Sequence, residues 1–90
     1  MDATEEDFTS LYFLELHKNV QELGEAARQI LADPACGHVF RIKGFAKEDG
    51  WKQINATRDH MLTADVAEGQ EVLIVIGENL QKGRIEHNLL

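Results

Sequence analysis

Hydrophobic residues change their spacing several times along the chain, and each change predicts a new element. Residues 8–16 form a short run rich in aromatic residues and leucine, which predicts a strand. Asn19 and Glu22 then have the spacing of a capping box, and apolar residues recur behind them at the intervals of an amphipathic helix. The helix is expected to end at Asp33, because the residue before a proline is pushed out of helical conformation. Its apolar stripe comprises Val20, Leu23, Ala27, Ile30 and Leu31.

The period becomes two from residue 38, which predicts a β-hairpin. Residues 38–45 alternate between apolar and basic side chains, Asp49-Gly50 supplies a turn, and residues 51–57 form the returning strand. Because a one-residue slip exchanges the two faces of a strand, the apolar positions indicate the register. The core face is predicted to hold Phe40, Ile42, Ile54 and Ala56. The opposite face then collects Arg41, Lys43, Phe45, Trp51, Gln53 and Asn55.

The C-terminal part of the chain predicts two more strands and a second helix. Residues 60–65 form a short strand, and residues 71–76 form a nearly continuous apolar run, which is typical of a strand that is covered on both sides or lies centrally. Gly77 is expected to break the sheet, and Asn79 is expected to cap the closing helix. The apolar stripe of that helix comprises Leu80, Ile85, Leu89 and Leu90.

Residues 8–90 are therefore predicted to form a single α+β domain, preceded by a flexible acidic lead-in at residues 1–7. The elements follow the order β-α-β-β-β-β-α. Two helices need one sheet face to bury their apolar stripes, so the expected architecture is a two-layer sandwich. It has an antiparallel sheet of four or five strands with both helices on one face. The other face stays partly open.

The net charge limits the classes of binding partner that are expected, and the cysteine content limits the expected cellular compartment. Sixteen acidic residues against nine basic ones give a formal net charge of -7, and seven of the acids lie in residues 1–25. Binding to nucleic acid or to an anionic membrane depends on neutralising phosphates with lysine and arginine, so neither is an expected partner. Cys36 is the single cysteine, which excludes an intramolecular disulfide and favours a cytoplasmic location.

Sequence motifs for catalysis are missing. No window matches the phosphate-binding P-loop, the Gly-x-Ser-x-Gly nucleophile elbow or a Cys-x-x-Cys pair. The chain by itself is therefore not expected to be an enzyme, and no nucleotide-binding residue is predicted in it.

One local cluster has metal-ligand chemistry. Asp33, Cys36 and His38 combine a carboxylate, a thiolate and an imidazole within six residues, and all three groups bind zinc or cobalt in proteins. The simpler interpretation makes Cys36 a small buried residue in a helix-to-strand connection and His38 an edge position. Both interpretations stay open from the sequence.

The open-face set also has two interpretations. Arg41 and Lys43, flanked by Phe45 and Trp51, have the residue types that are enriched at the energetic centres of protein interfaces. The alternative is a solvated sheet face on which Trp51 covers the hairpin. The sequence predicts an interaction surface here.

Residues 38–90 resemble a known domain. The segment Arg41-Ile42-Lys43-Gly44-Phe45, a following strand with Trp51, and Val75-Ile76-Gly77 with Asn79-Leu80 are similar to the C-terminal domain of the CobW-type GTPases. That domain typically has an Arg-x-Lys-Gly segment, an aromatic on the next strand and a Val-x-Ile-Gly-x-x-Leu junction into its last helix. Residues 8–32 correspond to its first strand and helix.

The resemblance implies a role in metal handling. The family couples a P-loop GTPase domain to this smaller domain, and it is thought to deliver zinc or to handle cobalt for cobalamin synthesis. Its GTP-binding and metal-binding residues belong to the other domain and have no counterpart in this sequence. The implied function is a non-catalytic interaction domain whose partner is a P-loop GTPase domain, in cis or in trans, or a metalloprotein client. The alternative is a small metal-binding protein that uses Cys36 and His38.

Overall fold

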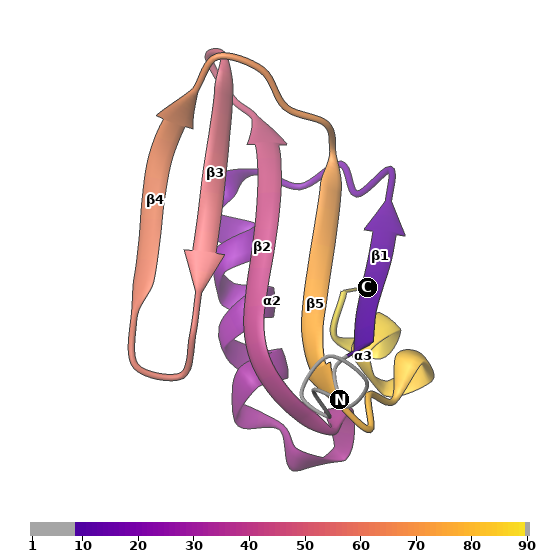
Figure 1. Cartoon of the computed structure of the whole chain (residues 1–90). Coiled ribbons are helices and arrows are strands. Elements are labelled where there is room, and N and C mark those ends of the chain that lie inside the picture. Colours follow the sequence, from indigo (N-terminus) through magenta and orange to yellow (C-terminus); the bar gives the residue numbers. More distant parts are fainter. Residues whose placement is uncertain (1–8, 90) are drawn as a thin grey trace, which may run out of the picture.

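Five antiparallel strands and two α-helices make up residues 9–89, the part of the chain that the computed structural model describes (Figure 1). The strands lie in the order β1-β5-β2-β3-β4. The predicted α+β class and element order are confirmed, whereas the expected lead-in at residues 1–7 lies outside the described residues. In chain order the elements are β1 (Thr9–Leu14), α2 (Val20–Ala32), the 3-10 turn η1 (Pro34–Cys36), β2 (His38–Lys47), β3 (Trp51–Ala56), β4 (Met61–Val66), β5 (Val72–Glu78) and α3 (Lys82–Asn88).

The ends of α2 follow the predicted local chemistry. The Asn19 side chain accepts a hydrogen bond from the backbone N–H of Glu22 at 2.8 Å, and the Glu22 carboxylate accepts one from the backbone N–H of Asn19 at 3.0 Å. This reciprocal pair satisfies two backbone donors that a helix start leaves without partners. The helix ends at Asp33, directly before Pro34, as expected.

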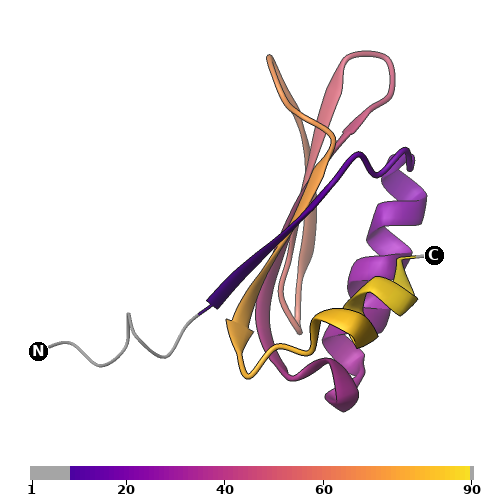
Figure 2. The same cartoon turned by 90° about the vertical axis from the view of Figure 1, so that its right-hand side faces the viewer.

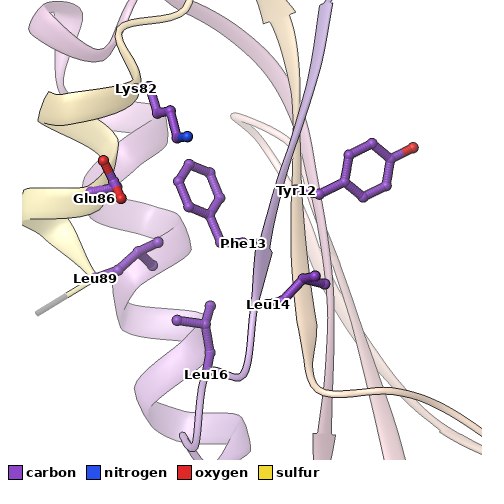
Figure 3. A pocket seen from close by; sticks show the side chains of 7 residues that line it. All are labelled: Tyr12, Phe13, Leu14, Leu16, Lys82, Glu86 and Leu89. Atoms are coloured by element: carbon purple, nitrogen blue, oxygen red, sulfur yellow. The ribbon is translucent and has the colours of Figure 1, made fainter.

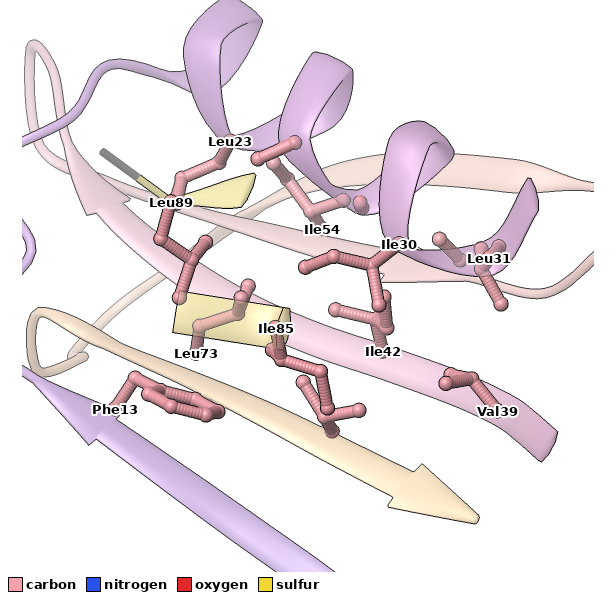
Figure 4. Close-up of a cluster of buried hydrophobic side chains, with 14 of the residues drawn as sticks. Phe13, Leu23, Ile30, Leu31, Val39, Ile42, Ile54, Leu73, Ile85 and Leu89 are labelled. Carbon is pink, nitrogen blue, oxygen red and sulfur yellow. The ribbon is translucent and has the colours of Figure 1, made fainter. Parts of the chain in front are cut away.

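Both helices cover the same face of the sheet (Figure 2). The apolar stripe of α2 packs on β2 and β3, and α3 adds Ile85 and Leu89 beside β1 (Figure 4). Within residues 9–89 the fully buried side chains are all apolar, so the core depends on burial of apolar area and contains no polar network. In the same range, neither helix has the length and hydrophobicity needed to cross a bilayer.

The prediction that Phe40 lies in the core is wrong. The register between β2 and β5 shifts between Val39 and Arg41, which is the sign of a β-bulge. The bulge adds one residue to β2, so Val39 and Ile42 both face the helices and are buried. Phe40 is half-buried instead, and its ring centroid lies 4.4 Å from that of His38. Ile42, Ile54 and Ala56 are buried as predicted.

The expectation that Gly77 breaks the sheet is also wrong. Gly77 lies inside β5 and pairs with Thr9 on one side and Val39 on the other. A Cβ at this position would lie 2.2 Å from the carbonyl oxygen of His38, so the backbones at the bulge approach more closely than any side chain permits. Only glycine fits there.

The closing helix begins later than expected. Asn79 does not cap α3: it has a φ of 55° and lies in the connection. Gln81 is the N-cap, and its side chain makes no capping hydrogen bond but donates to the backbone carbonyl of Asn79 at 3.1 Å. The backbone N–H of Gln81 instead donates to the carbonyl of Cys36 at 2.9 Å. The start of α3 is therefore positioned by the segment that precedes β2, which a local capping rule does not consider.

Replacing Gly77 with alanine is predicted to destabilise the fold by about 2 kcal/mol or more, because a methyl group meets the β2 backbone where it cannot move aside. The urea midpoint of unfolding measures this change. Gly83→Ala is the matched control: a Cβ there meets open space in α3, and alanine favours a helix over glycine by up to about 1 kcal/mol. Equal midpoints for the two variants would contradict the close approach at the bulge.

Candidate functional site

The helices leave the other face of the sheet bare (Figure 2). Strand pairing puts the predicted interaction residues on that face. Lys43 pairs with Asn55 across β2 and β3, and Phe45 pairs with Gln53. Strand alternation puts Arg41 on the same face as Lys43. Trp51, which pairs with Lys47, extends this face to the hairpin end. The structure therefore brings together Arg41, Lys43, Phe45, Trp51, Gln53 and Asn55, and that they bind a partner stays a prediction.

The two cations at the centre of this face have no acidic partner within residues 9–89. The Arg41 Nε donates a hydrogen bond to the Asn55 Oδ1 at 2.8 Å, which orients the guanidinium without neutralising it. The neighbours of Lys43 across the ladder are Ile74 on β5 and Asn55 on β3, and both are uncharged. Ion pairs in the described part of the chain join His17 to Glu71, His38 to Glu78, Lys52 to Asp65 and Arg84 to Asp33.

Trp51 is less available than the sequence suggests. The loop between β4 and β5 passes over it: a Cβ on Gly69 would lie 2.8 Å from the Trp51 ring and 3.3 Å from the Phe45 ring. The Lys47 Nζ lies 6.0 Å from the Trp51 ring centroid, at the outer range of a cation–π contact. The half-buried Trp51 therefore packs at the hairpin end.

An apolar area on the same face was missed by sequence reasoning. Tyr12 on β1 pairs with Ile74 on β5, and Leu62 on β4 pairs with Asn55 on β3, so these side chains continue the rows that contain Lys43. Tyr12, Leu14 and Leu62 are the large hydrophobic residues that remain exposed in the described range, at 62%, 58% and 69%. The alternation of residues 8–16 contained a signal for Tyr12 and Leu14, but the pairing of the first strand with the last one was not predictable from it.

A shallow hollow of about 290 Å³ lies on the other side of β1, between that strand and α3 (Figure 3). Phe13 and Leu16 point into it from the strand side, and Leu89 lines it from the helix side, whereas Tyr12 points away. Lys82 and Glu86 are its charged lining residues, and they lie one helical turn apart on α3. This composition is that of a groove at the margin of the core and does not suggest a reaction centre.

Two of the three predicted metal ligands are held in a structural contact. The Asp33 Oδ2 accepts hydrogen bonds from the Arg84 Nε at 2.7 Å and from the Asn88 Nδ2 at 3.4 Å, and the Oδ1 accepts one from the backbone N–H of Ala35 at 2.9 Å. The hydrogen bond from Arg84 is the main reason that the pKa of Asp33 lies below its usual value. This carboxylate ties α3 to the turn that precedes β2.

Cys36 is wholly buried beneath this contact. Burial raises the pKa of its thiol, and the charge of Asp33 adds to the effect, so the thiolate form that binds metals is disfavoured. His38 is exposed, and its Nδ1 lies 3.5 Å from a carboxylate oxygen of Glu78. Among residues 9–89, no three side chains of His, Cys, Asp or Glu converge as a metal site. A site at Asp33, Cys36 and His38 thus stays a prediction for metal analysis to decide.

Comparison with known proteins supports the fold. No protein-family model matches the sequence, and no curated protein sequence matches it. Among solved structures, the chain is similar to the Zn(II)-bound YjiA GTPase from E. coli, with a TM-score of 0.63, 19% identity, and coverage of 94% of this chain and 29% of that one. A Zn(II)-bound triple mutant of YjiA GTPase gives a TM-score of 0.65, 16% identity, and coverage of 91% and 28%.

These similarities concern the fold. The chain has the fold of part of the Zn(II)-bound YjiA GTPase. The chain spans less than a third of the length of the YjiA structures that it matches.

The contact at Asp33 predicts a specific acid dependence. Because the pKa of Asp33 is lower in the folded protein than in the unfolded chain, its stabilisation is complete above the unfolded value of about 3.9 and is lost as the pH falls through the folded pKa. Asp33→Asn is expected to lower the urea midpoint at pH 7 and to flatten its decline below about pH 4. Asp59→Asn, in the exposed turn between β3 and β4, serves as control. An unchanged acid limb in Asp33→Asn would contradict this assignment.

Proposed function

We propose that the chain is a non-catalytic protein-interaction domain of a GTP-dependent metallochaperone system. Its partner is a P-loop GTPase domain, joined to it in cis or bound in trans, or a metalloprotein client. The system delivers zinc or cobalt, or handles metal for cobalamin synthesis. The supporting observation is a fold that matches part of a Zn(II)-bound GTPase over 94% of this chain, combined with a sequence that lacks the P-loop motif.

The residues on which the resemblance to CobW-type C-terminal domains rests fall into two groups, according to where they lie in the fold. Gly44 and Gly77 lie where the core or a neighbouring backbone leaves no room for a side chain; a Cβ on Gly44 would lie 2.8 Å from Leu73 Cδ1. The others, Arg41, Lys43, Phe45 and Ile76, lie on the open face of the sheet. Packing accounts for the glycines but not for Arg41 and Lys43, two cations that form no ion pair with any residue in the range 9–89, and a binding role on that face would account for them.

Binding to a GTPase domain tests the proposal directly. Isothermal titration of the purified chain with GTP and Mg²⁺ should show no binding, whereas titration with the P-loop GTPase domain that its gene or a neighbouring gene encodes should give a micromolar or tighter complex. Micromolar affinity of the chain alone for GTP would overturn the assignment. A failure to bind that GTPase domain in its GTP-bound, GDP-bound and empty states would overturn it as well.

The metal content of the purified chain tests the alternative, which is that the chain is a small metal-binding protein. After dialysis against zinc or cobalt and removal of free ion, the chain is expected to retain much less than one ion per molecule, because Asp33 is engaged with Arg84 and the Cys36 thiol is buried. Elemental analysis measures the ratio. Stoichiometric metal that disappears in a Cys36→Ala/His38→Ala double variant would establish the alternative. A buried Cys36→Ala change alters packing, so His38→Ala alone is measured beside it.

A further inference from the structure

The open face combines apolar margins with a cationic centre. Tyr12 and Ile74 form one apolar margin, across β1 and β5, and Leu62 on β4 forms the other. Arg41 and Lys43 lie between them on β2, the middle strand of the sheet. Exposed hydrophobic residues that gather on one face mark a surface that another element covers. We define these five residues as the docking face.

The charged residues of the docking face indicate which sign of charge its partner carries. The neighbours of Arg41 and Lys43 across β5 are Ile76 and Ile74, and no described ion pair involves either cation. The chain as a whole carries sixteen acids against nine bases, so this face has the opposite sign to the rest of the protein. A second copy stacked face to face would bring two more cations to the same surface, and like charges across an interface are unfavourable. Carboxylates on a partner complement them.

The hydrogen bonding of the sheet backbone indicates which type of secondary structure can cover the docking face. The ladders of β5, β2 and β3 engage both edges of each of these strands, so the docking face offers side chains and no free backbone groups at its centre. An added strand would therefore join the edge of β1 or β4 instead. In α+β and α/β layer folds the element that covers a sheet face is an amphipathic helix, as α2 does on the opposite side.

We propose that the docking face binds an amphipathic helix of a partner protein whose apolar stripe is flanked by carboxylates. The apolar stripe contacts Tyr12, Ile74 and Leu62, and the carboxylates pair with Arg41 and Lys43. The inference rests on the proposed function, because it specifies how an interaction domain without its own chemistry recognises its partner. It adds the class of element and the sign of its charge.

Two synthetic helical peptides of equal length test the proposal. Both carry the same leucine stripe at i, i+3, i+4 and i+7 spacing, continued over about four helical turns so that it spans the sheet, and it is flanked by glutamate in one peptide and by lysine in the other. The glutamate peptide is expected to bind the intact chain about tenfold more tightly, which corresponds to two partly screened ion pairs. The net charge of -7 would give the opposite preference if general electrostatics decided, so the sign of the difference is diagnostic. Backbone amide shifts of the isotope-labelled chain locate the bound peptide.

Charge reversal on the docking face provides the matched variants. Arg41→Glu/Lys43→Glu is expected to reverse the order of the two peptides, whereas Arg28→Glu/Arg58→Glu makes the same charge change on α2 and on the β3–β4 turn and should preserve it. Tyr12→Ala and Leu62→Ala should weaken both peptides alike, with little change in urea midpoint, since both side chains are more than half exposed. Circular dichroism confirms that each variant is folded.

Several outcomes would overturn the docking proposal. These are equal affinity for the two peptides, no binding of either at millimolar concentration, amide shifts confined to the outer edge of β1 or β4, and a dimer whose contacts map to the docking face. The proposed function fails separately. If the glutamate peptide binds as expected but the GTPase domain does not, the docking face stands and the assigned partner is wrong. If the GTPase domain binds wild type and Arg41→Glu/Lys43→Glu equally, the docking proposal is wrong and the proposed function stands.

Discussion

The placement of β5 between β1 and β2 is the constraint on which the rest of the structure depends. Leu73 and Val75 of β5 face the helices and are fully buried, while Ile74 and Ile76 alternate to the other side. At its end, Gly77 permits the bulged backbone of β2 to approach closely enough for Val39 to enter the core. The chain then continues through residues 79–81 into α3, whose Ile85 and Leu89 close the core beside β1. β5 thus connects β1, the central strand β2 and the closing helix α3.

One-sided coverage follows from the small number of elements. Two helices bury one face of a five-stranded sheet, and the chain has no third helix among the described residues to cover the other. A sheet in this position usually carries polar residues on its outer side. Here β5 is apolar on both sides and the outer strands add Tyr12 and Leu62, so the open face combines exposed apolar margins with a cationic centre.

The contact around Asp33 gives a structural role to a residue that the sequence pattern predicts as a metal ligand. Asp33 begins the η1 turn, and its carboxylate holds Arg84 and Asn88 of α3, which lie more than fifty residues away in the sequence. Cys36 is buried beneath this contact, and burial raises the pKa of its thiol. Local spacing placed a carboxylate, a thiol and an imidazole together, but the bulge and the direction of β2 leave His38 exposed beside Glu78. Long-range partners, invisible in a short window, decide how such residues are used.

The sequence by itself determined the features whose causes are local. The capping box of Asn19 and Glu22, the end of α2 at Asp33, the hairpin with its alternating faces, and the α+β order all follow from spacing within a few residues. Tertiary structure alone decided the strand order and the bulge, which puts Val39 in the core in place of Phe40. It also decided the need for Gly77 inside β5 and the late start of α3. It also decided that Tyr12 and Leu62 share a face with Arg41 and Lys43. The physical reason is that strand pairing joins residues far apart in the chain, and side-chain periodicity records which residues alternate but not which strands become neighbours.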